Sequence, residues 1–165
     1  MSVLSDTSYI IDLRVNSDHN DVHFAIGERD LADVVARLMS YQPWWLWLLY
    51  AIRVLLAKAL RLRTDGLPRR QQYTAADISF DRGAELSFFS VDAGEPDRYW
   101  AGTISDKHLN AWLVVTRDDM HGGLARFGLT TFVTFHNRSG RFYFALIKPF
   151  HHLVVRSMLR YAVKS

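Results

Sequence analysis

The sequence predicts an α+β domain: a curved antiparallel sheet of about seven strands packs against a long C-terminal helix, and two helices follow the first strand. The hydrophobic pattern changes from helical to alternating near Tyr73, so we expect helices before this point and strands after it. The connections between the later strands are too short for crossover helices, which favours an antiparallel meander. The chain ends in an amphipathic segment, and a curved sheet needs such a helix to bury its inner face.

Length and composition indicate one globular domain over residues 1–165, because 49% of the residues are hydrophobic and 22% are charged. The net charge of +3 is too weak to indicate a nucleic-acid partner. The absence of cysteine excludes disulfides, thiolate metal sites and a cysteine nucleophile. Five Trp, seven Tyr and ten Phe predict broad apolar surface, as core or as the wall of a pocket. The N-terminus lacks the basic start and apolar stretch of a signal peptide, so we expect a cytoplasmic protein.

The N-terminal part is expected to hold the first strand and two helices. Residues 8–15 have strand-like composition, so the first 19 residues predict an extra edge strand or an extended arm, and residues 21–26 predict the first strand of the sheet. Asp30 is a plausible N-cap for a short helix over LADVVARLMS. Pro43 suits the first turn of a second helix, which runs to about Arg63 and is followed by a polar connection.

The segment from Trp44 to Leu60 is strongly apolar, but two basic residues interrupt it and it is shorter than the roughly 20 residues that span a bilayer. We therefore expect no integral membrane span. A helical wheel predicts one buried stripe, with Arg53 and Arg61 exposed. The stripe consists of Trp45, Leu48, Leu49, Ile52, Leu55, Leu56 and Ala59. A basic cluster nearby is either a solvated face or a surface for peripheral membrane contact; it consists of Arg61, Arg63, Arg69 and Arg70.

Six strands are expected after residue 73. They are predicted near residues 75–80, 85–92, 97–104, 108–116, 124–137 and 140–147. The sequence Asn137-Arg138-Ser139-Gly140 predicts a short hairpin turn before the last strand. Pro149 then suits the first turn of the C-terminal helix, whose apolar face includes Phe150 and Val154.

The C-terminal half resembles a bacterial family known as domain of unknown function 2867. The resemblance rests on DKHLN from Asp106 to Asn110, on TTFVTFHNRSGRFYFALIKPFHHLVVRSMLR from Thr130, and on the helix QPWWLWLLYAIRVLLAKALRLR; it covers roughly residues 20–162. The family is similar to the START-like, polyketide-cyclase-like superfamily, which implies the helix-grip fold. That superfamily contains lipid carriers, plant hormone receptors and aromatic cyclases. Asn110 stands where family members tend to have an acidic residue.

Asp106 and His108 form the first candidate site, at a strand start where residues two apart share a face. A carboxylate beside an imidazole orients the ring and raises its basicity, which suits a general base. The two are therefore the candidate catalytic pair, and Tyr99 or Tyr143 would donate a hydrogen bond to an oxyanion. The alternative is a turn aspartate that caps a loop beside a surface histidine.

Further aromatic and polar residues are expected to bind a ligand: Trp100, Asn110, Trp112, His136, Tyr143 and His151. His136 lies on a strand face of mixed polar and aromatic residues, which is either a pocket lining or an exposed sheet face. The motif Pro149-Phe150-His151-His152 is expected at a helix start, where it offers free N–H groups or fixes the helix on the sheet. Adjacent helical histidines point about 100° apart and the chain has no compact metal-ligand spacing, so we expect neither a metal nor a cofactor.

Three functions of different classes are compatible with these features. The first is binding of a hydrophobic small molecule, lipid-like or polyketide-like, in an internal cavity of a monomer or homodimer. The alternative is a cyclase- or dehydratase-type enzyme that uses the same cavity with His/Asp acid–base chemistry. The third is a purely structural or accessory module.

Overall fold

The computed structural model describes residues 2–59 and 71–164, and it confirms the predicted α+β architecture. Six strands form one antiparallel sheet in the order β1-β6-β5-β4-β3-β2. The strands are β1 (His19–Gly27), β2 (Glu85–Leu86), β3 (Phe89–Glu95), β4 (Tyr99–Ser105), β5 (Leu109–Asp119) and β6 (Ala125–Phe135). β1 pairs with β6 alone and is therefore an edge strand of the sheet.

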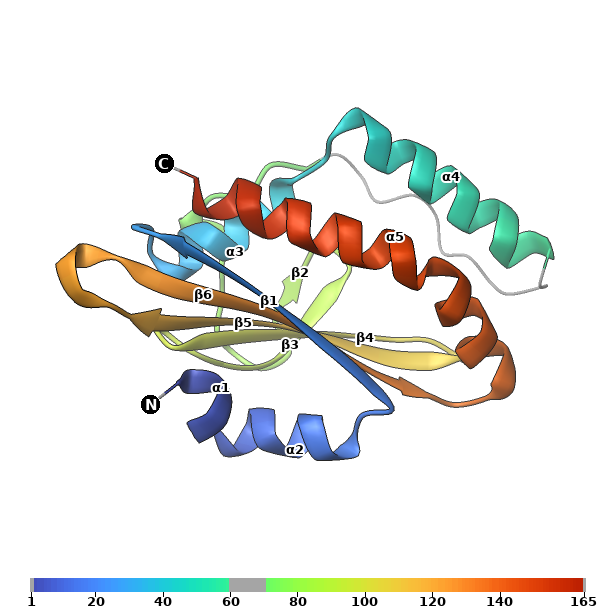
Figure 1. Ribbon diagram of the computed structural model, residues 1–165, viewed down its shortest axis with the longest axis horizontal. Helices are drawn as coiled ribbons and strands as arrows, with labels where there is room; N and C mark the ends of the chain where they lie inside the picture. Colours follow the sequence, from blue (N-terminus) through green and yellow to red (C-terminus); the bar gives the residue numbers. More distant parts are fainter. Residues whose placement is uncertain (1, 60–70, 165) are drawn as a thin grey trace.

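Helices cover both faces of the sheet (Figure 1). One side carries α3 (Leu31–Ser40), α4 (Trp44–Ala59) and α5 (Arg138–Val163), and the other carries α1 (Val3–Asp6) and α2 (Ser8–Asn16). The two helices after the first strand are α3 and α4, as predicted. α5 runs across the sheet and contacts α3, α4, β1 and β6, which makes the fold helix-grip-like.

Each face of the sheet buries its own core, because side chains alternate along a strand. Between the sheet and the helices α3 and α5, the buried residues include Trp100, Phe127 and Leu159. Between the sheet and the N-terminal helices, Ile10 packs against Phe132 and others. Residues of β5 and β6 therefore belong to one core or the other according to whether their number is odd or even.

The N-terminal segment is helical, so the predicted extra strand or arm over residues 8–15 is wrong. Ile10 is fully buried, and Leu13, one turn further on, packs against the same core. The backbone N–H of Val3 donates to the Asp118 carboxylate over 2.6 Å, which ties α1 to β5. This segment packs on a face of the sheet and does not pair with its edge.

The C-terminal helix begins at Arg138, so the predicted hairpin and the predicted strand over residues 140–147 are wrong. Asn137 is the N-cap of α5: its side-chain oxygen accepts a hydrogen bond from the Gly140 N–H over 2.9 Å. Its side-chain amide donates to the carbonyl of Lys107 over 3.2 Å. Two hydrogen bonds of one asparagine thus fix the start of α5 against the loop between β4 and β5.

The first turns of α5 combine a strand-like composition with the burial pattern of a helix. They are rich in aromatic residues, but their buried members, Gly140, Tyr143 and Phe144, have the spacing of a helix. A Cβ at Gly140 would collide with the carbonyl oxygen of His108, so only glycine permits this close approach. Pro149 lies inside α5 and not at its start, and because proline lacks an N–H donor the helix bends in its first half (Figure 1).

Residues 75–80 do not form the predicted strand, and the single strand predicted over residues 85–92 is divided into β2 and β3. With the predicted strand over residues 140–147 also absent, the sheet has six strands and not seven. Residues 75–80 contain the 3-10 helix η1 (Ala75–Asp77), which a capping box begins: the backbone N–H and the hydroxyl of Thr74 both donate to the Asp77 carboxylate. A second 3-10 helix, η2 (His121–Gly123), joins β5 to β6.

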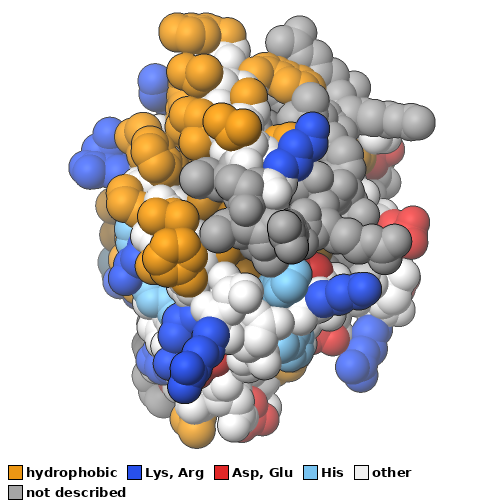
Figure 2. Space-filling view, turned by 90° about the vertical axis from the view of Figure 1, so that its right-hand side faces the viewer, with side chains coloured by type: hydrophobic (Ala, Val, Ile, Leu, Met, Phe, Trp, Pro, Cys, Tyr) orange, Lys and Arg blue, Asp and Glu red, His pale blue; other side chains and the backbone are white. Residues whose placement is uncertain are grey.

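α4 packs on α5, but its buried side differs from the predicted stripe. Leu46 is buried, whereas Leu48 and Leu55 are 59% and 69% exposed. Among the helices of the described residues, none is long and apolar enough to cross a membrane. Figure 2 shows hydrophobic side chains gathered on this side of the molecule, and the exposed ones of α4 and α5 include Trp44, Leu48, Leu55, Phe142, Leu146, Phe150 and Leu153. The side chains of Arg53, Leu56 and Ala59 and the whole basic cluster lie outside the described residues.

Candidate functional site

A cavity of about 190 Å³ lies between α3, α4, α5 and the start of β3. Apolar side chains form most of its wall: Leu38, Met39, Leu46, Trp47, Phe88, Phe89, Leu113, Val154, Val155 and Met158. His151, from the middle of α5, is one of the polar residues in this wall. The cavity therefore has an apolar wall and an imidazole that connects it to the polar groups beneath α5.

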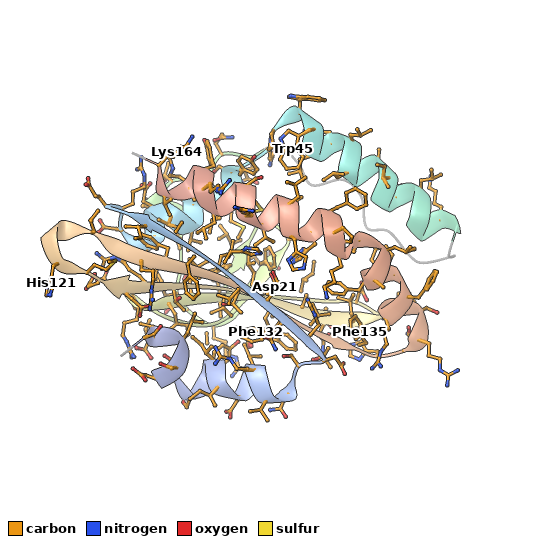
Figure 3. The ribbon with its side chains drawn as sticks, viewed as in Figure 1. Asp21, Trp45, His121, Phe132, Phe135 and Lys164 are labelled. Carbon is orange, nitrogen blue, oxygen red and sulfur yellow. The ribbon has the colours of Figure 1, made fainter. Side chains whose placement is uncertain are left out.

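Those polar groups form a cluster of four histidines around one aspartate, which we call the histidine–aspartate cluster. It consists of His19, Asp21 and His23 on β1 and His151 and His152 on α5. Figure 3 shows Asp21 on β1, beneath α5. The Asp21 Oδ2 atom lies 3.1 Å from His23 Nε2 and 3.3 Å from His152 Nδ1. The other oxygen, Oδ1, lies 3.7 Å from His19 Nε2 and 3.9 Å from His151 Nε2.

The alternation of β1 places three of these residues on one face of an edge strand. His19, Asp21 and His23 are partly buried, whereas the residues between them, Asn20 and Val22, are exposed. Because side chains two apart share a strand face, the three polar residues all lie beneath α5. The sheet therefore presents polar side chains to α5 along this edge and apolar side chains to α5 at its centre.

Burial controls the charge of two of the histidines. It lowers the pKa of His151 below its ordinary value, although Asp21 acts in the opposite direction. Burial also lowers the pKa of His19, and Lys148 lowers it further. Both rings are therefore neutral at neutral pH. His151 Nε2 is within 3.2 Å of the Thr131 hydroxyl, which gives it a hydrogen-bond partner from β6.

The predicted catalytic pair lies beside the start of α5, away from the residues that line the cavity. The Asp106 carboxylate accepts hydrogen bonds from the backbone N–H groups of His108 and Leu109, over 2.6 and 2.9 Å. This is the geometry of the turn-capping alternative. The His108 ring lies beside the Asn137 side chain, with Nδ1 3.1 Å from the amide nitrogen. A proton-transfer role for this pair stays a prediction.

Three of the predicted ligand-binding residues, Asn110, Trp112 and His136, lie on the sheet face that the N-terminal helices cover. Trp112 packs there and donates from its indole N–H to Asp92 over 3.1 Å. Asn110 shares this face of β5, and its side-chain oxygen is 3.1 Å from His136 Nε2. Tyr99, an expected oxyanion donor, also lies there and stacks on Tyr9, and burial raises the pKa of Tyr99.

The other three lie on the α5 side of the sheet. Trp100 is completely buried in the core and donates to the Ser79 carbonyl over 3.2 Å. Tyr143 is buried in the first turns of α5. Of the six predicted ligand-binding residues, His151 is the one that the structure places in the lining of the cavity, within the described part of the chain.

Sequence reasoning missed Asp21 and its neighbours on β1, and it expected no metal ligands. That expectation rested on spacing along the chain. In the structure one ligand atom from each of Asp21, His23 and His152 lies within 4.8 Å of the other two. The available signal was the sequence His19-Asn20-Asp21-Val22-His23, whose ionisable residues recur with the period of a strand.

A family model matches most of this chain. The model of the family described as "Protein of unknown function (DUF2867)" matches residues 16–158. The matched region contains the whole sheet, α3, α4 and all five members of the histidine–aspartate cluster. No curated protein matches the chain.

Proposed function

Because the chain belongs to the DUF2867 family, whose description assigns no function, we propose a function from the geometry: the domain binds a small hydrophobic molecule in the cavity beneath α4. The observation that carries this proposal is an apolar cavity of about 190 Å³ with His151 in its wall. The helix-grip-like fold supports it, since a sheet that curves around a helix leaves room between the two layers. The family resembles the START-like superfamily, which contains carriers of lipids, and this resemblance supports a hydrophobic ligand.

The volume of the cavity limits the ligand. An engineered apolar cavity of about 150 Å³ holds one benzene molecule. The cavity of this protein therefore suits one aromatic ring or a short alkyl chain, and a lipid-like or polyketide-like molecule would place one such group inside. His151 supplies a hydrogen bond to a hydroxyl or carbonyl group on that ring or chain.

Benzene and phenol are the probes that test this proposal, because they differ only in a hydroxyl group. We expect both to bind the full chain and to raise its melting temperature, and we expect phenol to bind more tightly. Val154→Phe fills the cavity and should abolish binding of both probes. Leu153→Phe adds the same ring at the neighbouring, 54% exposed position of α5 and is the matched control.

A second substitution tests the polar end of the cavity. His151→Leu replaces the imidazole with an apolar side chain of similar size. It should weaken phenol binding about fivefold, which corresponds to about 1 kcal/mol for one hydrogen bond, and leave benzene binding unchanged. The proposed cavity would be contradicted if both probes still bind to Val154→Phe. It would also be contradicted if Leu153→Phe abolishes binding as well.

One observation favours the enzyme as a second candidate function. His151 stands between the cavity and the Asp21 carboxylate, with its Nε2 3.9 Å from Oδ1. This His/Asp arrangement at the cavity is suited to acid–base chemistry. An enzyme would convert a bound substrate, and His151→Leu would lower turnover by roughly 10²–10⁴-fold. Mass spectrometry of a ligand recovered after incubation distinguishes the two functions, because a binding protein returns it unchanged.

A further inference from the structure

We propose that Asp21, His23 and His152 form a binding site for one divalent transition-metal ion. The site uses one carboxylate oxygen and two imidazole nitrogens, from β1 and α5. The inference does not depend on the proposed hydrophobic ligand, because none of these three residues lines the cavity as the structure describes it.

The distances are those of metal ligands around a shared centre. Zinc–nitrogen and zinc–oxygen bonds are about 2.0–2.2 Å long, so neighbouring ligand atoms of a tetrahedral site are about 3.3 Å apart. Asp21 Oδ2 is 3.1 Å from His23 Nε2 and 3.3 Å from His152 Nδ1. The third pair of ligand atoms, on His23 and His152, lies within 4.8 Å. Rotation of these side chains would bring the three atoms around one ion.

The carboxylate lacks the partners that a buried charge normally has. The Asp21 side chain is 11% exposed, and both of its oxygens are shielded from solvent without a hydrogen bond from any described residue. His23 Nε2 is also shielded and has no hydrogen bond, although it lies 3.1 Å from Asp21 Oδ2. Burying a carboxylate and a ring nitrogen without hydrogen bonds destabilises the folded protein. A cation bound between the two groups would compensate for this loss.

The ligand types select the class of metal. Two imidazoles and one carboxylate suit zinc, iron, cobalt or manganese, whereas calcium and magnesium take mostly oxygen ligands and copper(I) takes sulfur. Three protein ligands leave at least one coordination position open. His19 and His151 lie 3.7 and 3.9 Å from the second oxygen of Asp21, and a small rotation of the carboxylate on binding an ion would bring them within hydrogen-bond reach to orient it.

The site is accessible to ions from the surface. β1 is an edge strand, and the His152 side chain is 37% exposed. An ion can therefore reach the cluster between the edge of the sheet and α5 without opening the core.

Calorimetric titration of the chelator-treated full chain with Zn²⁺ tests the stoichiometry. We expect one ion per chain. Asp21→Asn, His23→Ala and His152→Ala should each weaken binding by about 100-fold or more, while His151→Ala, at an orienting position, should cost about tenfold. His121→Ala is the matched control, because His121 is exposed in η2, at the loop that joins β5 to β6, and its removal should change nothing.

Two measurements on the unmodified chain keep the proposal testable if a variant does not fold. Co²⁺ should give the visible absorption of a low-symmetry site with nitrogen ligands. In a long-range ¹H–¹⁵N NMR spectrum, Zn²⁺ should shift the ring nitrogens of His23 and His152, and leave those of His108, His121 and His136 in place. The absence of stoichiometric Zn²⁺ binding, or shifts confined to the latter three histidines, would overturn the inference. Benzene binding in the same samples reports on the cavity independently.

Discussion

Replacing Asn137 by alanine should cost about 2 kcal/mol of unfolding free energy. The substitution removes the N-cap hydrogen bond to Gly140, and loss of an N-cap typically costs about 1 kcal/mol. It also removes the hydrogen bond to the Lys107 carbonyl, for which about 1 kcal/mol is usual. The two interactions act on different groups, so their contributions should add approximately.

Urea unfolding monitored by circular dichroism measures this cost, as a lower midpoint with an unchanged slope. Asn137→Ser keeps a cap oxygen but loses the amide donor, so it should recover about half of the loss. Asn20→Ala is the control, since Asn20 is exposed on β1 and should change stability by less than about 0.5 kcal/mol. A loss below about 0.5 kcal/mol for Asn137→Ala, or no recovery with serine, would refute the assignment of Asn137 as the residue that starts α5.

Three further substitutions test the fold around the site. Gly140→Ala should lower the melting temperature in a thermal scan, because the new Cβ meets the backbone carbonyl of His108, and an unchanged melting temperature would contradict this close approach. Trp100→Ala should cost about 3–5 kcal/mol in urea unfolding as a core truncation, and a cost below about 1 kcal/mol would contradict its burial. Burial alone would raise the pKa of Asp118, but hydrogen bonds from Val3, Arg126 and Ser2 outweigh it and hold that pKa below its ordinary value. The stabilisation is therefore complete above the unfolded pKa of about 3.9 and is lost as the pH falls through the lower folded value. Asp118→Asn should flatten the acid limb of a stability–pH curve, and an unchanged limb would contradict this role.

Capping and packing decided the elements whose local pattern was ambiguous. In residues 140–147 the aromatic residues favour a strand locally, yet the Asn137 cap and the burial of Tyr143 and Phe144 stabilise a helix. The segment over residues 8–15 is too short to show a clear helical period. Only its contact with the sheet determines which of its residues are buried. The capping box of η1 is readable in the sequence as Thr74-Ala75-Ala76-Asp77, and it favours a helical turn over the predicted strand.

The sequence by itself determined the class of the fold. Strand alternation in β3 to β6, short connections and an amphipathic C-terminal segment are local properties, and they sufficed for an antiparallel sheet packed on a helix, with two helices after the first strand. His151 could be selected because it belongs to a helix expected to face the sheet.

Only the tertiary structure decided where polar residues meet. β1 and α5 are far apart in the sequence, and the pairing of β1 with β6 places Asp21 beneath His151 and His152. The same packing separates Asp106 from the cavity, although the spacing of Asp106 and His108 suggested a catalytic pair. Local patterns specify which face of an element is polar, but the face it meets across the core depends on long-range pairing, and no short stretch of the chain encodes that pairing.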